Sequence, residues 1–185
     1  GSAPNFYTNR IFPTTNQNGS ALQDLLYYYY DNYDFNSDGT PDYAYISQGL
    51  TGEASATPLT RGLSTGLYMK TLNNDGTLSV WLHTVNFYDK RGNLIQVQSN
   101  SHVNSSASDT RTNVPDFSGK TLQSRIVKTV NSVTTSVLAT YSYDNGNRLQ
   151  TIDQSNNGGS SVRVANYIYN ELGQLVNKKL HSTDH

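Results

Sequence analysis

The sequence predicts an all-β protein in which antiparallel β-hairpins follow one another as a meander and form a curved or coiled sheet. Three observations support this prediction. A motif of extended segment, tight turn and second extended segment occurs four times in the second half of the chain. Residues after each turn alternate between polar and apolar positions with a period of two, which is typical of strands. Finally, 14 of the 185 residues are Tyr, which favours strands and combines a large apolar surface with a polar hydroxyl.

Composition excludes several classes of protein. A length of 185 residues allows one domain with a core, although only 35% of the residues are hydrophobic. The formal net charge of −1 provides no electrostatic basis for binding nucleic acid or an anionic membrane. No apolar run reaches the roughly 18 residues of a transmembrane helix, so no membrane span is predicted. The absence of cysteine excludes disulfides and thiolate chemistry.

Composition divides the N-terminal region into two parts. Residues 1–20 are predicted to be a tag scar, Gly1-Ser2, followed by a loose lead-in rich in Pro, Asn, Thr and Gly. Residues 21–83 are predicted to form an N-terminal β segment. Its first part, residues 21–30, fits either a helical turn or a strand, and the tyrosines at 27–30 favour the strand.

The rest of this N-terminal β segment is predicted to alternate turns with strands. A turn-rich region comes first, then a short strand, a loop and a hairpin with a strong turn signal. The turn region is residues 31–42, the short strand 43–47 and the loop 53–58. The hairpin consists of strands 66–72 and 77–88, joined through Asn73-Asn74-Asp75-Gly76.

Residues 84–185 are predicted to form a sheet of repeats. The four copies span residues 85–97, 112–124, 140–152 and 166–178, and their anchor residues are separated by 27, 28 and 26 positions. A period of this size indicates stacked supersecondary units. Because a single hairpin is marginally stable in water, stacking of each hairpin on its neighbours must stabilise the sheet.

The turn of each repeat has a predicted mechanism. The anchor side chain is expected to accept hydrogen bonds from backbone N–H groups that follow it. A Gly or Asn three residues later supplies a positive φ, and the Tyr before the anchor packs on the neighbouring hairpin. The predicted repeat-turn residues are Tyr88, Asp89, Gly92, Asp116, Gly119, Tyr143, Asp144, Asn147, Tyr169, Asn170 and Gly173.

Residues after the turns sort into two columns. Positions seven and nine residues after each anchor are polar in every copy, whereas positions six and eight are mostly apolar. The polar residues are Gln96, Gln98, Gln123, Arg125, Thr151, Asp153, Asn177 and Lys179. This separation predicts an antiparallel sheet with one face in water, since a helix would mix the columns.

The repeat resembles the tyrosine-aspartate (YD) repeat of the Rhs family. Tyr88-Asp89-Lys90-Arg91-Gly92-Asn93-Leu94 matches the pattern of Tyr-Asp, two variable residues, Gly, a polar residue and Leu. The fourth copy has Asn170 in place of Asp, and the third has Asn147 in place of Gly. The second copy lacks the Tyr and has Thr121 in place of Leu.

The resemblance extends upstream, although less specifically. Residues 28–35 and 61–66 resemble the lead-in of large secreted Rhs-type proteins of Bacteroidetes-like bacteria. The resemblance implies a non-catalytic structural segment of a secreted or cell-surface bacterial protein. In that family the repeats form a shell around a C-terminal cargo, often a toxin domain released by self-cleavage.

The resemblance also implies the partners of this chain. They are the neighbouring YD repeats of a longer chain and the enclosed cargo. Since the sequence ends at His185 without a closing element, we expect it to be a piece of that longer protein. Its open sheet edges would then pair with further repeats.

A separate motif in the N-terminal β segment predicts a calcium loop. Its spacing, D-x-N-x-D-G-x-x-D, places side-chain oxygens at positions 1, 3, 5 and 9, a backbone carbonyl at 7 and Gly at the sharp turn. The candidate Ca²⁺ ligands are Asp34, Asn36, Asp38, Thr40 and Asp42. The pattern resembles EF-hand-like loops and the calcium loops of extracellular β-propellers, but it lacks the Glu at position 12. The alternative is a surface turn rich in Asp, Asn and Gly that binds no ion.

Exposed aromatic residues provide an alternative function. Trp81, Tyr141 and Tyr167 are candidates for stacking on sugar rings. Together with the calcium motif they predict, as the alternative, a calcium-dependent module that binds carbohydrate or a cell surface. The competing interpretation is that these rings only fill space between the sheet and its surroundings.

No enzyme is predicted. Residues 62–66 match the G-x-S-x-G pattern around Ser64, but a nucleophile elbow requires a helix after the serine, and a strand is predicted there. The four histidines form no cluster with the spacing of a zinc site.

Overall fold

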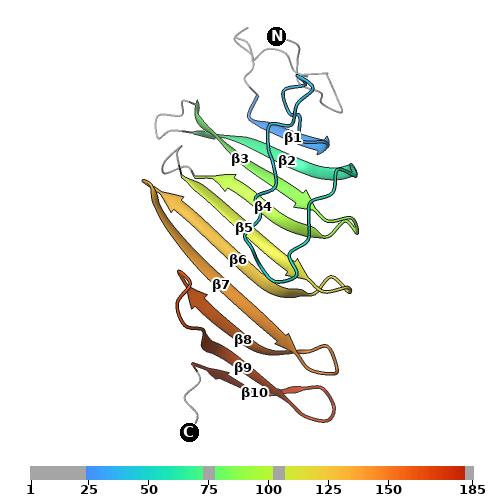
Figure 1. Cartoon of the computed structure of the whole chain (residues 1–185), viewed down its shortest axis with the longest axis vertical. Helices are drawn as coiled ribbons and strands as arrows, with labels where there is room; N and C mark the ends of the chain where they lie inside the picture. Colours follow the sequence, from blue (N-terminus) through green and yellow to red (C-terminus); the bar gives the residue numbers. More distant parts are fainter. Residues whose placement is uncertain (1–23, 73–77, 102–106, 182–185) are drawn as a thin grey trace, which may run out of the picture.

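The computed structural model describes residues 24–72, 78–101 and 107–181 (Figure 1). Regular structure in these ranges is entirely β, and no helix is present. Ten strands form one open sheet in the order of the sequence, and each strand is antiparallel to the next. The predicted all-β antiparallel meander is therefore confirmed.

The strands differ in length, and the longest is β2. They are β1 (Leu26–Asp31), β2 (Thr60–Leu72), β3 (Leu78–Tyr88), β4 (Leu94–Asn100), β5 (Ser108–Pro115), β6 (Thr121–Val130), β7 (Val133–Tyr143), β8 (Leu149–Asn156), β9 (Val162–Tyr169) and β10 (Leu175–Leu180).

The four predicted repeats correspond to four hairpins. These are β3–β4, β5–β6, β7–β8 and β9–β10, and their turns lie along one side of the sheet (Figure 1). The described connections between repeats, from β6 to β7 and from β8 to β9, lie along the other side. The boundary placed at residues 83 and 84 falls within β3, so the sheet is continuous across it. Residues 1–20 and the turn at 73–76 lie outside the described residues.

A long connection between β1 and β2 crosses one face of the sheet. This crossing segment, residues 32–59, runs over the strands that follow β2 (Figure 1). It reaches as far as β6, where the guanidinium of Arg125 donates to the carbonyl of Gln48 at 2.9 Å. The predicted short strand at 43–47 is wrong, because this part of the chain lies across the sheet face and has no strand beside it.

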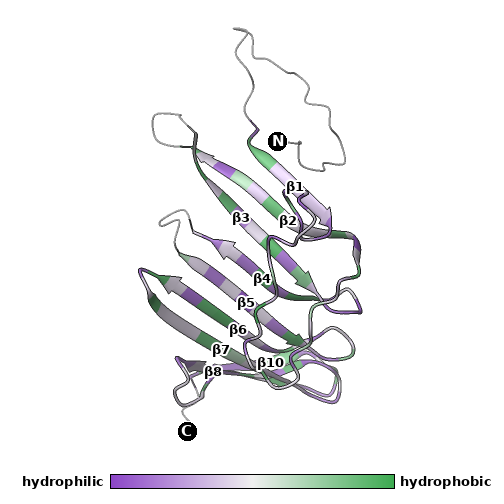
Figure 2. Cartoon of the chain, turned by 45° about the horizontal axis from the view of Figure 1, so that its top comes forward, coloured by the Kyte–Doolittle hydropathy of each residue, from purple (hydrophilic) through white to green (hydrophobic). Residues whose placement is uncertain are grey.

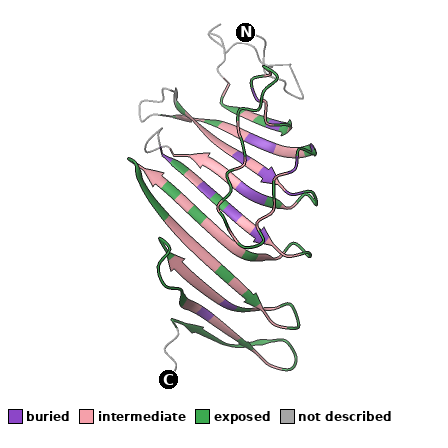
Figure 3. Ribbon diagram, in the orientation of Figure 1, coloured by how far each residue is buried: buried purple, intermediate pink, exposed green. Residues whose placement is uncertain are grey.

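The core lies beneath the crossing segment. Its buried side chains are Tyr29, Phe35, Val85, Phe87 and Ile95, and tyrosines and alanines of the crossing segment pack around them. Phe35 lies directly on Gly66, where a Cβ atom would be 2.5 Å from the ring. A side chain at position 66 would therefore displace the Phe35 ring from its place in the core. Figure 3 shows most of the buried residues concentrated in this part of the sheet.

The register defines two faces of the sheet. Phe87, Gln96 and Thr112 pair in succession across β3, β4 and β5, so they share the face beneath the crossing segment, here called the covered face. Tyr141 and Ile152 pair on the opposite, open face. Apolar and polar residues alternate along the strands that form the two faces (Figure 2).

The predicted wet face is wrong for the first repeat. The polar column lies on the covered face, and Gln96 is 0% exposed. Its amide donates to the carbonyl of Ile46 and accepts from the Ile46 N–H, while Gln98 donates to the carbonyl of Ala44. These side chains bind the main chain of the crossing segment in place of water.

Strands β7–β10 form a single layer. Figures 1 and 3 show no described segment over them, and of their residues only Thr151 and Ala165 are buried. Every residue of β10 is exposed. No helix in the described ranges could cross a membrane.

Candidate functional site

The repeat turns have the same hydrogen bonds in all four copies. Asp89 Oδ1 accepts from the backbone N–H groups of Arg91 and Asn93 at 2.8 and 2.9 Å. Equivalent pairs of bonds, to the residues two and four positions later, form at Asp116, Asp144 and Asn170. In each turn the anchor side chain therefore accepts the backbone hydrogen bonds that the sequence predicts.

The residue three positions after each anchor has the expected backbone conformation. The φ angles are 80° at Gly92, 88° at Gly119, 61° at Asn147 and 80° at Gly173. Each of these residues donates its N–H to the carbonyl of its anchor. Asn147 adopts the left-handed conformation because Asn tolerates it better than other non-glycine residues.

Hydrogen bonds within the turns lower the pKa values of the anchoring carboxyl groups. Burial alone would raise the pKa of Asp89, but donors from the side chain and backbone of Asn93 and from the Arg91 N–H outweigh it. The Ser118 hydroxyl lowers the pKa of Asp116, and the Arg148 N–H lowers that of Asp144. Charged anchors therefore bind the turn more strongly than neutral ones would.

A β-bulge follows each turn at the same position. In β4 the pairing shifts between Leu94 and Gln96, which leaves Ile95 unpaired and places it in the core. The equivalent unpaired residues of the other repeats are Leu122, Gln150 and Val176. The bulge lies six residues after each anchor, so it belongs to the repeat.

Tyrosine hydroxyls connect successive hairpins. Tyr88 donates to the carbonyl of Ser64 at 2.7 Å, Tyr143 to that of Thr121 at 2.8 Å, and Tyr169 to that of Leu149 at 2.9 Å. Each acceptor lies in the strand that precedes the hairpin. Burial raises the pKa of Tyr88 and of Tyr143, so their hydroxyls remain donors. The second repeat has Pro115 at this position and lacks the bond.

Sequence reasoning missed a fifth copy of the repeat. Tyr30-Asp31 ends β1, and the pairing with β2 shifts between Ser64 and Gly66, as it does after the turns of the other copies. Ser64 accepts the Tyr88 hydroxyl, and Gly62 has a φ of 79°, matching Gly92. The turn of this copy is expanded into the crossing segment. The Tyr30-Asp31 pair and the Gly62-Leu63-Ser64 run were the available signals, but the insertion separates them.

The predicted calcium loop is closed by its own hydrogen bonds. The Asp34 carboxylate accepts from the N–H groups of Asp38 and Gly39 at 3.0 and 2.9 Å. Asp42 Oδ2 accepts from the N–H groups of Phe35 and Asn36 at 2.7 and 3.2 Å. The Asn36 amide donates to both Asp38 and Asp42. The Asn36 side chain thus links Asp38 to Asp42 at the end of the motif.

The acidic side chains of the loop are engaged by hydrogen bonds within the loop. Within the described residues, no three His, Cys, Asp or Glu side chains converge well enough to hold an ion. The Asp38 carboxylate accepts from the Thr40 hydroxyl at 2.6 Å and from the Thr40 N–H at 2.8 Å. These bonds lower the pKa of Asp38, the hydroxyl contributing most. An incoming Ca²⁺ would have to replace the Asn36 amide contacts with oxygen ligands.

The three candidate sugar-stacking residues do not form one site. Trp81 lies on the covered face, where it stacks on Tyr27 with ring centroids 5.0 Å apart and lies under Lys70. Tyr141 and Tyr167 lie on the open face, and the Lys178 amine is 5.4 Å from the Tyr167 ring. A single ligand therefore cannot contact Trp81 together with the two tyrosines.

Ser64 and His83 both belong to strands of the sheet. Ser64 is within the continuous strand β2, so the helix required after a nucleophile elbow is absent from the described residues. His83 packs against Tyr43 and Tyr68, and burial lowers its pKa. His102 and His185 lie outside the described residues.

The sequence matches no model of a known protein family, and it matches no curated protein. Function therefore has to be argued from the geometry of the chain itself.

Proposed function

We propose that the chain is a non-catalytic structural repeat segment of a large secreted or cell-surface bacterial protein of the Rhs type. In this proposal further YD repeats extend the sheet, which forms part of a shell around a C-terminal cargo such as a toxin. The segment acts as a wall, and its partners are neighbouring repeats and the enclosed cargo.

One observation supports the proposal most strongly: a single interface recurs between successive hairpins. The bulge recurs from the pairing of β1 with β2 to that of β9 with β10, and in three of the four hairpins a tyrosine hydroxyl bonds to the strand that precedes the hairpin. A hairpin of the same design can therefore be added at β10, whose main-chain edge pairs only with β9 in the described part of the chain. Repeated addition of identical units builds an extended surface, with no catalytic group repeated in it.

The first experiment adds one hairpin after Leu180. Its turn carries Tyr-Asp, and a matched version carries Phe-Asp, which cannot donate to the Leu175 carbonyl. We expect the Tyr version to slow amide hydrogen exchange in β10 more than the Phe version does. Equal exchange rates in β10 with and without the added hairpin would contradict extension by repeats.

The second experiment concerns the enclosed cargo. In the longer protein, limited proteolysis should leave the region after the repeats intact until the repeats themselves are cleaved. A point cleavage engineered into the exposed turn at Leu172, which is 83% exposed, should then release or expose the cargo. Rapid digestion of that region while the repeats remain intact would exclude a shell.

The loop at residues 34–42 supports a second candidate function. We propose as the alternative a calcium-dependent β module that binds carbohydrate or a cell surface. The observation that favours it is the mutual approach of Asn36, Asp38 and Asp42, whose oxygens are the ligand type that Ca²⁺ prefers. The crossing segment would then be stabilised by the ion.

Thermal melting with added CaCl₂ tests this alternative. We expect millimolar CaCl₂ to raise the melting temperature by a few degrees and EDTA to reverse the rise. Asp38→Asn should abolish the rise, whereas Asp109→Asn, in strand β5, should preserve it. An unchanged melting temperature, together with glycan-array signals that EDTA does not alter, would leave only the structural proposal.

A further inference from the structure

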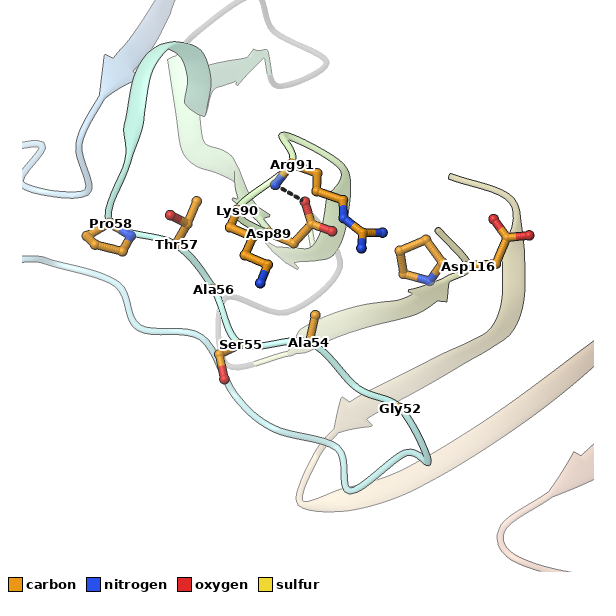
Figure 4. Close-up of a pocket in the computed structure, with 11 residues that line it drawn as sticks. Gly52, Ala54, Ser55, Ala56, Thr57, Pro58, Asp89, Lys90, Arg91 and Asp116 are labelled. Atoms are coloured by element: carbon orange, nitrogen blue, oxygen red, sulfur yellow. Dashed lines mark hydrogen bonds between the residues drawn. The ribbon is translucent and has the colours of Figure 1, made fainter. Parts of the chain in front are cut away.

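A groove runs between the crossing segment and the turns of the first two repeats. Its volume is about 560 Å³, within the roughly 300–1,000 Å³ range of small-ligand sites. Residues 52–58 form one wall, and Asp89, Lys90, Arg91, Pro115 and Asp116 line the rest (Figure 4).

The acidic residues of the groove are already used by the repeat turns. Asp89 accepts hydrogen bonds from the backbone of Arg91 and Asn93 and from the Asn93 side chain. Asp116 accepts from Ser118 and Lys120, and the Lys120 amine lies 3.6 Å from its second oxygen. Their negative charges are therefore directed into the turns.

The basic side chains of the groove are not held by short polar contacts, although the charge of Arg91 contributes to the lowered pKa of Asp89. Among the described residues, the side chains of Lys90 and Arg91 make no hydrogen bond and no ion pair within 4 Å. Figure 4 shows both side chains extending from the turn over the groove. The other three turns have no basic residue at these two positions, so the repeat itself does not require the charges.

The wall formed by the crossing segment presents a main-chain edge. Ala54 and Ala56 pack toward the core while Ser55 is exposed, which is the alternation of an extended chain. The Thr57 N–H is bonded to the Tyr88 carbonyl at 2.8 Å, and the Glu53 N–H to the Leu50 carbonyl. Between them, the main-chain groups of residues 54–56 make no hydrogen bond within the described ranges.

We propose that this groove binds an extended acidic peptide segment. The peptide main chain pairs with residues 54–56 as an added strand, and an acidic side chain lies between Lys90 and Arg91. The proposal requires only the described groove, so it does not depend on whether the chain belongs to a shell. Charge complementarity favours an acidic occupant. A neutral peptide would remove water from the two cations without providing a counter-charge.

A labelled peptide tests the proposal. The probe is a fluorescein-labelled Val-Glu-Val-Glu-Val peptide, compared with its Gln isostere by fluorescence polarisation at low salt. We expect the Glu peptide to bind at least about tenfold more tightly, with an affinity that falls as salt rises. Equal affinities, or no binding of the Glu peptide at high protein concentration, would overturn the proposal.

Matched variants locate the site. Lys90→Ala/Arg91→Ala should weaken binding about tenfold, whereas Lys178→Ala/Lys179→Ala, which removes the same charge from β10, should leave it unchanged. All four side chains are exposed, so neither variant should alter folding, and a melting curve checks this. An equal loss of affinity in both variants would mean that the peptide responds only to net charge.

Amide chemical shifts test the mode of binding. We expect the largest changes at Ala54, Ser55 and Ala56 when the Glu peptide is added. Changes confined to other strand edges would contradict the groove. Binding of oligogalacturonate through Lys90 and Arg91 without binding of the peptide would also overturn the proposal, since the occupant would then be an acidic saccharide.

Discussion

The two halves of the sheet use the same repeat but bury very different parts of it. In the first repeat, Phe87 and Ile95 are 1% and 0% exposed, whereas the residues at the same positions of the last repeat, Ile168 and Val176, are 39% and 59% exposed. The turns of both repeats have the same hydrogen bonds. The difference comes from the crossing segment, which provides a second layer over the first half. Turn chemistry can therefore specify a hairpin, but a second layer is needed to build a core.

The largest expected effect is the loss of the aromatic contact between the two layers. Phe35 is 5% exposed and stacks on Tyr29 with ring centroids 4.2 Å apart. We expect Phe35→Ala to reduce the free energy of unfolding by about 3–5 kcal/mol, measured by urea denaturation. Phe117→Ala is the matched control, because Phe117 is 85% exposed in the turn of the second repeat. A similar cost for both variants would mean that the crossing segment does not stabilise the first half.

A smaller effect is expected at the polar column. Gln96→Leu removes the side chain that binds both main-chain groups of Ile46 and the Thr112 hydroxyl. We expect a loss of about 1–3 kcal/mol in the free energy of unfolding. Asn177→Leu changes the same repeat position in β10, where it is exposed, and should alter stability by less than about 0.5 kcal/mol. If Asn177→Leu costs as much, the column has the same role in both halves.

The hydrogen bonds of the tyrosine hydroxyls should contribute equally to stability in the two halves of the sheet. Tyr88→Phe and Tyr169→Phe each remove one hydroxyl that donates to a main-chain carbonyl of the preceding hairpin. We expect each to cost about 0.5–1.5 kcal/mol, because the bond is the same with or without a second layer. Differential scanning calorimetry of both variants measures this. A cost only at Tyr88 would show that the bond depends on the crossing segment.

The smallest expected effect depends on pH. Folding lowers the pKa of Asp89. The Asp89 carboxylate therefore adds to the free energy of unfolding above the unfolded pKa of about 3.9, and this stabilisation is lost as pH falls through the lower folded value. Asp89→Asn should therefore cost about 1 kcal/mol at pH 7 and progressively less toward pH 3. Asn170→Asp should introduce the same acid sensitivity into the last turn. Urea denaturation at both pH values measures the difference, and a cost of Asp89→Asn that is independent of pH would contradict it.

Much of the repeat could be predicted from the sequence, because its chemistry is local. The anchor bonds of Asp89 and Asp144 reach only four residues along the chain, so the residues that make them are visible in one motif. The copy at Tyr30-Asp31 could not be predicted in the same way. Its partner residue Ser64 is separated from it by the crossing segment, and only the pairing of β1 with β2 shows that they belong together.

The candidate sites differ in the same way, since only a site formed by one continuous stretch of the chain could be predicted. The oxygens of Asp34 and Asp42 could be placed in one loop from their spacing alone, because the loop is nine residues long. The groove at Lys90 and Arg91 could not be foreseen, since its opposite wall at residues 52–58 comes from a different part of the chain. The sequence could not show whether Trp81 shares a face with Tyr141 and Tyr167. The register decides this, and it places Trp81 on the opposite face from the two tyrosines.

The sequence by itself determined the turns of the four repeats, the order of their strands and the all-β class of this protein. Each depends on residues close together in the chain, where hydrogen bonding and backbone conformation follow directly from the side chains present. Only the tertiary structure decided which face of the sheet is buried. The polar column was expected to face water, yet Gln96 is completely buried because the main chain of Ile46 satisfies its amide. Burial depends on which distant segment covers a surface, and a periodic pattern within one strand contains no information about that segment.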